Sequence, residues 1–362
     1  MPSKKLRILK VAVRDLKMPL IYPFWIASGK HDVLENVLFE IECENGIKGL
    51  GEAAVATHIT SETVTQTRGN LQRLADHLIG QDIADYPLLS TFAAKRLQGN
   101  KSALAAVEMA LLDAYTRSRG LPLWKFFGKR LHRIVTDITI VISQLSDTKN
   151  AARKFYSQGF RTFKVKIGRD FDGDINRVCA IAKIAPRAKM ILDANQAFST
   201  KQALAFLHEL KKVNIHPLLI EQPVPKADWE GLQEITRESQ VKVCADESIS
   251  SFKEALFVIQ RKAVDVINVK FMKTGIFEAQ QIAKLAVKHH VELMLGSMME
   301  SPISALAAAH FAGGSGFFKY IDLDTPFFIK GNILKNAYLG SNGIYHLVKI
   351  KQGIGVVSKR ED

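Results

Sequence analysis

Three acidic residues each follow a run of apolar residues directly, in a pattern that suits metal binding. They are Asp193, Glu221 and Asp246. Three carboxylates that meet at one point repel each other unless a cation lies between them. No histidine or cysteine follows these runs, and a set of oxygen ligands favours Mg²⁺, with positions left open for a substrate. The alternative is that each acid caps the next helix, but polar residues nearer to those helices suit that role: Ser199 or Thr200, Asp228, and Ser250 or Ser251.

Three lysines and an asparagine lie in the apolar runs on either side of the acids. Lys164 and Lys166 precede the first acid, and Asn268 and Lys270 follow the last. Residues two apart in a strand share a face, and an outward face would bury two ammonium groups beneath a helix, so both lysines of the first pair should point inward. A lysine near a dication and a second lysine has its pKa lowered toward roughly 7 to 8, which suits a general base. We therefore expect Lys166 and Lys270 to take a proton from one face of a carbon and return it on the other.

A second pair of acids, Asp322 and Asp324, ends the last apolar run within Tyr320–Pro326. The two share a face by the same rule, and carboxylates outside the metal set call for a cationic partner, such as a substrate ammonium group. The alternative is that one aspartate forms a surface salt bridge and the other a turn. Thr139, expected to point inward from the first strand, is a further candidate for substrate contact, whereas Lys273 is expected to be solvated or to support the site.

The elements that position these residues follow a regular period. Positions 166, 193, 221, 246 and 270 are roughly 24 to 28 residues apart, which is the length of a strand, a helix and two loops, and position 322 comes two such steps later. A βα unit repeated about eight times closes a barrel whose strand ends meet at one mouth. We expect strands near residues 135–142, 161–167, 189–194, 217–222, 241–246, 264–270, 291–297 and 317–322. We expect helices near residues 147–159, 171–186, 200–213, 228–237, 251–260, 276–288 and 301–313.

Residues 1–127 do not follow this period and predict an α+β capping domain. An antiparallel sheet is expected over Leu6–Val13, Val33–Cys43 and Gly46–Gly51, with a hairpin turn at Asn45-Gly46. Three helices are expected to follow, over Glu62–Leu78, Asp85–Gln98 and Ser102–Arg119. Residues 128–325 are expected to form the catalytic barrel, and the glycine-rich segment 326–362 to return to the capping domain. Because no long linker separates the two domains, we expect them to be rigidly apposed.

The composition limits the class of protein. The 362 residues are 47% hydrophobic and 24% charged, as is ordinary for a soluble globular protein. No apolar stretch reaches the roughly 18 residues of a membrane span, and three widely spaced cysteines favour a reduced cytoplasmic setting. The net charge of +14 raises the alternative of a non-catalytic basic protein that binds nucleic acid. The lysines are scattered through the predicted helices, however, so we expect a small-molecule substrate, no nucleic-acid or membrane partner, and a homo-oligomer.

Five short motifs together resemble the muconate-lactonising subgroup of the enolase superfamily. They are Lys164–Lys166, Asp193–Asn195, Glu221–Pro223, Ala245–Ser248 and Asn268–Gly275. The resemblance covers essentially the whole chain. It implies an α/β fold, a (β/α)7β modified TIM barrel with an α+β capping domain that is built from the N-terminal region and the C-terminal tail.

The resemblance also implies a mechanism. In that family the three acids bind Mg²⁺, which stabilises an enediolate formed from a carboxylate substrate, and the two lysines that map to Lys166 and Lys270 form the acid/base pair. Lys164 would add positive charge near the substrate carboxylate. The segment Tyr320–Pro326 resembles the motif by which dipeptide epimerases hold the amino end of a dipeptide, and Ser297 would line the pocket. The implied reaction is epimerisation of a dipeptide at the α-carbon of its C-terminal residue.

Other reactions of the family keep the same machinery. They are o-succinylbenzoate synthesis, N-acylamino-acid racemisation and cycloisomerisation, whose substrates have no free ammonium group for Asp322 and Asp324. The side chain of the second substrate residue is a separate question. Epimerases that act on Ala-Glu dipeptides tend to carry an arginine in the capping-domain loop, which Pro23–Asp32 lacks. Lys30 is the candidate substitute as a point charge, whereas Phe24 and Trp25 would favour an apolar side chain.

Overall fold

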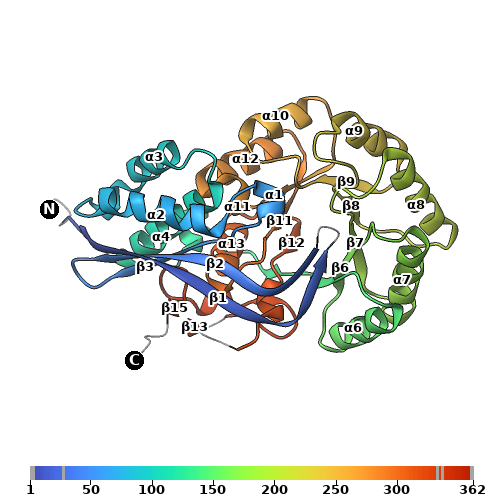
Figure 1. The fold of residues 1–362 in the computed structure, drawn as a ribbon, viewed down its shortest axis with the longest axis horizontal. Helices are drawn as coiled ribbons and strands as arrows, with labels where there is room; N and C mark the ends of the chain where they lie inside the picture. Colours follow the sequence, from blue (N-terminus) through green and yellow to red (C-terminus); the bar gives the residue numbers. More distant parts are fainter. Residues whose placement is uncertain (1–4, 27–28, 332–333, 336–337, 359–362) are drawn as a thin grey trace.

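A computed structural model of the chain describes residues 5–26, 29–331, 334–335 and 338–358. Among these, the side chains of residues 22–26, 29–31, 58, 334–335 and 358 are left out of the description. The described chain has two parts. One is an antiparallel sheet with helices beside it, and the other is a set of parallel strands inside a ring of helices (Figure 1). Within the described residues no helix is both long enough and apolar enough to cross a membrane.

The N-terminal part opens with a three-stranded antiparallel sheet in the order β1 (Ile8–Ile26), β2 (Gly29–Cys43), β3 (Lys48–Ala53). The hairpin turn between β2 and β3 lies at Asn45-Gly46 as predicted, and Gly46 has the positive φ of +76° that such turns require. Strand β1 runs well past its expected end, and with β2 it reaches across to the barrel (Figure 1). The helices of this part are α1 (Thr57–Thr60), α2 (Val64–Leu78), α3 (Tyr86–Arg96), α4 (Lys101–Ser118) and α5 (Trp124–Phe127).

Helix α4 is the centre of the N-terminal part, because it is buried along most of its length. It lies so close to β3 that a side chain on Gly49 or Gly51 would overlap the backbone of Ala110 or Ala106. These two glycines therefore permit the close approach of helix and strand.

The barrel is a parallel sheet of eight strands in chain order. The strands are β5 (Ile138–Ile140), β6 (Thr162–Lys166), β7 (Lys189–Asp193), β8 (Leu219–Glu221), β9 (Lys242–Ala245), β10 (Val266–Val269), β11 (Glu292–Gly296) and β12 (Tyr320–Asp322). One expected strand is different, because residues 135–142 divide into β4 (Ile134–Val135) and β5. Strand β4 leaves the barrel to pair with β14 (Ile344–Tyr345) of the C-terminal segment.

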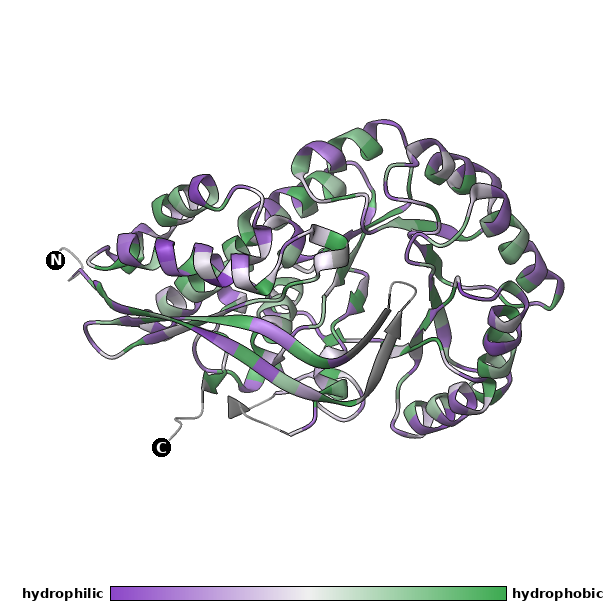
Figure 2. Ribbon diagram, in the orientation of Figure 1, coloured by the Kyte–Doolittle hydropathy of each residue, from purple (hydrophilic) through white to green (hydrophobic). Residues whose placement is uncertain are grey.

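Seven helices connect the eight strands, as predicted. They are α6 (Leu145–Ser157), α7 (Phe171–Ile184), α8 (Thr200–Lys212), α9 (Trp229–Glu238), α10 (Phe252–Gln260), α12 (Ile276–Lys288) and α13 (Pro302–Ser315), and the short α11 (Phe271–Thr274) follows β10. Several alternate between hydrophilic and hydrophobic residues, as amphipathic helices do (Figure 2). The side chains of Ser199, Asp228 and Ser251 cap α8, α9 and α10, so the acids at the strand ends are free of that task.

The barrel closes between its first and last strands without a regular ladder. The Asp137 N–H donates to the Ile321 carbonyl at 2.9 Å, and the Leu323 N–H donates to the Thr136 hydroxyl at 2.8 Å. One step further on, the Thr139 N–H donates to Asp324 Oδ2 at 2.5 Å. In two of these three hydrogen bonds a side-chain oxygen thus takes the place of a backbone carbonyl at the seam between β5 and β12.

Acidic residues of the N-terminal part hold the barrel helices. Glu52 on β3 accepts hydrogen bonds from the Ser301 N–H at 2.8 Å and the Ser304 N–H at 3.2 Å, at the start of α13. Glu108 on α4 accepts from the Ile276 N–H at 2.5 Å, at the start of α12. The first turn of a helix has free N–H groups and a positive dipole end, so each carboxylate fixes one part of the molecule to the other.

The C-terminal segment also contacts α4. The Ile354 N–H donates to Asp113 Oδ1 at 2.7 Å, and Arg117 Nη2 donates to the Val356 carbonyl at 2.7 Å. The imidazole of His310 on α13 accepts from the Trp124 N–H at 3.0 Å and faces the Ile354 carbonyl at 3.2 Å. The last described residues therefore bridge the barrel and the N-terminal part.

Candidate active site

A layer of apolar side chains inside the barrel lies below the polar residues at the strand ends. Its members are Ile191, Leu219, Cys244, Val266, Met294 and Tyr320, one from each of six successive strands. Two residues after each of them, on the same face, comes a residue of the mouth: Asp193, Glu221, Asp246, Asn268, Gly296 and Asp322. The alternation of side chains along the strands therefore places a layer of mouth residues next to a layer of apolar side chains inside the barrel.

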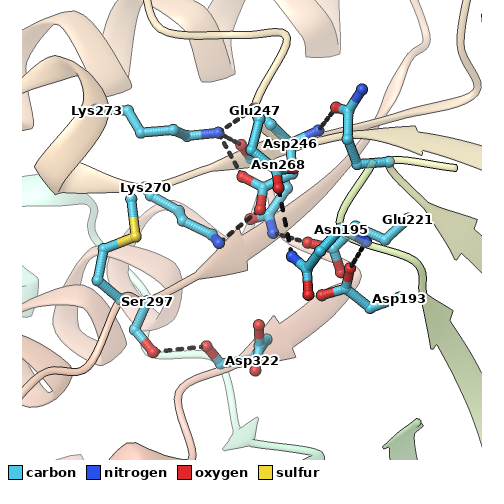
Figure 3. A network of polar contacts seen from close by, with 12 residues as sticks. Asp193, Asn195, Glu221, Asp246, Glu247, Asn268, Lys270, Lys273, Ser297 and Asp322 are labelled. Carbon is cyan, nitrogen blue, oxygen red and sulfur yellow. Dashed lines mark hydrogen bonds and ion pairs between the residues drawn. The ribbon is translucent and has the colours of Figure 1, made fainter. Parts of the chain in front are cut away.

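The acids and lysines that the sequence singled out meet in this polar layer, and Figure 3 shows Lys270 beside Asp246, with Asp193, Glu221 and Asp322 nearby. Lys164 Nζ lies 3.0 Å from Asp193 Oδ2, 2.9 Å from Glu221 Oε2 and 2.6 Å from Asp322 Oδ2. Lys166 Nζ lies 2.7 Å from Asp193 Oδ2. On the other side, Lys270 Nζ lies 2.7 Å from Asp246 Oδ2. The two lysines expected to act as acid and base thus approach the acidic cluster from opposite ends.

A cavity of about 280 Å³ gives access to these groups. Lys164, Lys166 and Lys270 line it, together with the further site candidates Thr139, Ser297, Asp322 and Asp324. The N-terminal part contributes residues 33–36 of β2 and residues 55–57, 59 and 64 around α1, so the mouth is covered from above. The side chains of Phe24, Trp25 and Lys30 lie outside the described part of the structure, so their expected contacts with the substrate stay predictions.

Electrostatics separate the acids of the cluster. Burial raises the pKa of Glu221 to about 8, and Asp193 beside it adds to the rise. Burial by itself would also raise the pKa of Asp193, but the positive charges of Lys164 and Lys166 outweigh it and lower the pKa of Asp193 to about 2. Burial favours a lower pKa for Lys270, yet Asp246 outweighs it and raises that pKa above its ordinary value. This direction applies to Lys270 paired directly with Asp246, whereas the lowered lysine pKa expected from the sequence depends on a bound dication and stays a prediction.

The residues present fit a hard divalent cation. Glu221 Oε2 is buried and accepts no hydrogen bond from the described residues, although Lys164 Nζ is near it. The other oxygen of this carboxylate accepts from Asn268 Nδ2 at 2.8 Å, which fixes its orientation. A buried carboxylate oxygen normally accepts a hydrogen bond or binds a metal ion, and Glu221 Oε2 accepts no hydrogen bond from the described residues. A bond to Mg²⁺ would satisfy this oxygen. Asp193, Glu221 and Asp246 are the residues that would hold the ion.

The acidic group with the closest oxygens is a different one. Within the described residues, only Asp137, Asp322 and Asp324 each bring one potential metal-ligating oxygen to within 4.8 Å of one another. The three acids expected to bind Mg²⁺ form no such group. A lysine ammonium group lies close to each of them. Burial raises the pKa of Asp324 to about 7, and Asp322 adds to the rise.

The two smaller candidates lie beside this second acidic group. Ser297 Oγ donates to the Asp322 backbone carbonyl at 3.1 Å (Figure 3). Thr139 holds Asp324 through its N–H group. The turn alternative for Asp324 is met in part, because a short 3-10 helix, η2 (Thr325–Phe328), begins directly after it. Neither aspartate is on the surface, since both are at most 5% exposed.

Of the two roles expected for Lys273, the structure bears out support of the site and not solvation, because Lys273 is 2% exposed and its Nζ lies 2.6 Å from Asp246 Oδ1. Sequence reasoning gave no role to three other polar residues of the site: Asn195, Glu247 and Asp137. Asn195 accepts a hydrogen bond from Lys166 Nζ at 2.9 Å and donates to Glu247 Oε1 at 3.3 Å. Strand alternation would place Glu247 on the outer face, but β9 ends before it. Asp137 lies two residues before Thr139, which was expected to point inward. The rule that residues two apart in a strand share a face, which placed the lysines, could therefore have placed Asp137 on the inner face as well.

A wall of the cavity is held from the N-terminal part. Asn36 Nδ2 on β2 donates to the Met299 carbonyl at 2.8 Å and to Glu52 Oε1 at 2.6 Å. Glu300 accepts from the Met298 N–H at 2.8 Å, and burial raises the pKa of Glu300 to about 8. The loop after β11, which lines the cavity, is therefore fixed by both parts of the molecule.

Comparison with known proteins covers nearly the whole chain. Residues 8–128 match the mandelate racemase / muconate lactonizing enzyme N-terminal domain, and residues 147–362 match the enolase C-terminal domain-like family. A hydrophobic dipeptide epimerase of Citrifermentans bemidjiense is 47% identical over 94% of this chain and 95% of that protein.

Solved structures share the fold closely. A mandelate racemase/muconate lactonizing protein from Herpetosiphon aurantiacus is 34% identical, with a TM-score of 0.94 over 99% of this chain and 100% of that one. A dipeptide epimerase from Enterococcus faecalis, complexed with Mg and the dipeptide L-Leu-L-Tyr, is 31% identical, with a TM-score of 0.93 over 98% of this chain and 100% of that one. The chain therefore belongs to the mandelate racemase / muconate lactonizing enzyme family of the enolase superfamily.

Proposed function

We propose that this protein is a Mg²⁺-dependent dipeptide epimerase that inverts the α-carbon of the C-terminal residue. One observation carries the proposal. Lys166 and Lys270 line the same cavity from opposite ends of an acidic cluster, and the acids Asp322 and Asp324 line it as well. The names of the relatives support the same reaction.

The two lysines have complementary tasks. A neutral lysine amine on one face of the α-carbon accepts its proton, and an ammonium group on the other face returns one, which inverts the centre. Mg²⁺ held by Asp193, Glu221 and Asp246 would supply positive charge that stabilises the negative charge that develops on the substrate carboxylate. Lys164, buried among three carboxylates, adds fixed positive charge to the same region.

The amino end of the dipeptide has a matching subsite. Asp322 and Asp324 are buried carboxylates at the cavity wall, and a substrate ammonium group would form charge-assisted hydrogen bonds with them. N-acylated substrates and cyclic lactones lack that group. The subsite therefore favours a free dipeptide over the substrates of the related racemases, synthases and cycloisomerases.

The side chain of the C-terminal residue is proposed to be apolar. The cavity wall from the N-terminal part carries Val33, Leu34, Val55 and Ile59, and the loop after β11 adds Met298. Each apolar side chain that a ligand covers contributes on the order of 1–3 kcal/mol. L-Ala-L-Leu should therefore have a higher kcat/KM than L-Ala-L-Glu. A preference for the glutamate dipeptide that disappears in Lys30→Ala would instead identify Lys30 as its partner.

Deuterium exchange tests the reaction and the two lysines together. In deuterated water with Mg²⁺, both epimers of the substrate should gain deuterium at the C-terminal α-carbon. Lys166→Ala should abolish exchange from one epimer and Lys270→Ala exchange from the other, because each lysine faces one side of the carbon. Lys284→Ala, on the exposed face of α12, is the matched control. Exchange of both epimers in both active-site variants would refute the proposed pair.

We also propose a cytoplasmic location and a homo-oligomeric state. All three cysteines are free thiols, which suits a reducing compartment. Cell fractionation checks the first proposal, and light scattering after size-exclusion chromatography checks the second. A single species with the mass of one 40.3 kDa chain would refute the oligomer.

A further inference from the structure

Asp137 is a buried acid with no role in the reaction described above. It is 2% exposed and lies just before β5, where its N–H closes the barrel seam. Neither of its carboxylate oxygens accepts a hydrogen bond from any described residue. A buried ionised carboxylate without a partner is costly, so this side chain needs a physical explanation.

The neighbours of Asp137 are acids that already have partners. Asp322 Oδ2 faces Lys164 Nζ at 2.6 Å, and Asp324 Oδ2 accepts the Thr139 N–H at 2.5 Å. One oxygen of each of these two acids lies within 4.8 Å of an oxygen of Asp137. Asp137 itself does not line the cavity, whereas both of its acidic neighbours do. It therefore lies beneath the proposed ammonium subsite.

Charge balance shows which form of Asp137 the site can hold. Lys164 is the cation that faces Asp137, and it is shared with Asp193 and Glu221. If Asp137, Asp322 and Asp324 were all ionised, these three neighbouring carboxylates would share the one ammonium group of Lys164. Burial raises the pKa of Asp137 well above its ordinary value, Asp322 and Asp324 raise it further, Lys164 opposes the shift and Glu221 adds to it.

We propose that Asp137 is a neutral carboxylic acid that donates its one proton to a carboxylate of the Asp322–Asp324 pair and so orients that carboxylate toward the substrate ammonium group. A carboxyl-to-carboxylate hydrogen bond is short and strong, and it spreads one negative charge over two groups. Asp137 is thus a positioning residue. The expected effect of Asp137 on substrate binding rests on the proposed dipeptide substrate. The neutral state of the Asp137 side chain does not depend on which substrate the enzyme uses.

The isosteric variant Asp137→Asn tests the proposal, because an amide keeps a donor at this position. The purified full-length enzyme should keep kcat and KM for L-Ala-L-Leu within about threefold. Asp137→Ala removes the donor and should raise KM about tenfold or more while kcat changes much less, since lost hydrogen bonds to charged groups cost this much. Asp322→Asn provides the reference for a damaged subsite. A KM raised as much in Asp137→Asn as in Asp322→Asn would overturn the proposal, because Asp137 would then act as a charge.

Infrared spectroscopy tests the protonation state without turnover. The wild-type minus Asp137→Asn difference spectrum at pH 7 should contain the carbonyl band of a protonated carboxylic acid. This measurement decides the question even if Asp137→Ala fails to fold, or if the protein epimerises no dipeptide. A difference spectrum with carboxylate bands instead would refute the neutral acid. Calcium binding by the wild type at a site that Asp137→Asn lacks would also refute it, since the cluster would then be a cation site.

Discussion

The ammonium group of Lys273 donates to the Asp246 carboxylate and to the Asn268 carbonyl inside the barrel wall. Its role is to hold the backbone and the carboxylate at the ends of two neighbouring strands, β9 and β10. At the scale of single residues, the site therefore contains charges that hold other charges in place as well as charges that line the cavity. Substitutions should separate the two kinds.

Lys273→Met should destabilise the fold, because it leaves Asp246 with one buried cation fewer. Removing one partner of a buried ion pair costs about 3–5 kcal/mol. Urea denaturation measures this loss in the free energy of unfolding. The exposed Lys284→Met is the control and should change stability by no more than about 0.5 kcal/mol. Equal stability of the two variants would show that Lys273 is not a structural ion.

Asp322→Asn should raise KM for free dipeptides by about tenfold or more, because the amide cannot pair with an ammonium group as a carboxylate does. N-acetylated dipeptides carry no such group, so any turnover of them should be little affected. Steady-state kinetics with matched free and acetylated substrates provide the comparison. An unchanged KM for the free dipeptide would favour racemisation of N-acylated amino acids or another family reaction.

At the scale of elements, His310 joins α13 to α5 and to the C-terminal segment. Its Nδ1 accepts from the Trp124 N–H, so the proton of the neutral ring is on Nε2, toward the Ile354 carbonyl. Burial lowers the pKa of this imidazole to about 3. The ring is therefore neutral wherever these three elements stay packed together.

The pH dependence of stability follows from this shift. Below about pH 6.5 the unfolded chain protonates His310 while the folded chain does not, so the folded state loses stability as the pH falls toward 3. The full difference is on the order of 5 kcal/mol, at about 1.4 kcal/mol for each pKa unit. His310→Gln should weaken the pH dependence of the unfolding free energy in this window. An equally steep curve in that variant would assign the effect to the acidic residues instead.

The elements were predictable from the sequence where their signal is local. Strand alternation and the regular period gave the barrel strands, the connecting helices and the inward face that carries Lys164 and Lys166. The break of the first strand was not predictable, because β4 pairs with a segment roughly 200 residues later. The same holds for the helix caps: Glu52 and Ser301 are 249 positions apart, and Glu108 and Ile276 are 168 apart. Propensity and periodicity contain no information on such pairings.

At the scale of the whole molecule, these long-range caps should make unfolding cooperative. Calorimetry of the wild type should give one transition, in which the barrel and the N-terminal part unfold together. The double variant Glu52→Ala/Glu108→Ala leaves buried N–H groups without acceptors, at about 1–3 kcal/mol for each group, and should separate two transitions. The exposed Glu234→Ala is the control. A single transition in the double variant would show that apolar packing alone couples the parts.

The seam between β5 and β12 contains a residue that is needed both for the closure of the barrel and for the proposed recognition of the substrate, and this limits how the barrel can evolve. Asp324 serves both the closure of the wall and the proposed ammonium subsite, so selection for a new substrate acts on a residue that folding also constrains. The first and eighth strands should therefore be inherited as a unit. Chimaeras with a relative should keep their stability when both strands are exchanged together and lose it when either is exchanged alone.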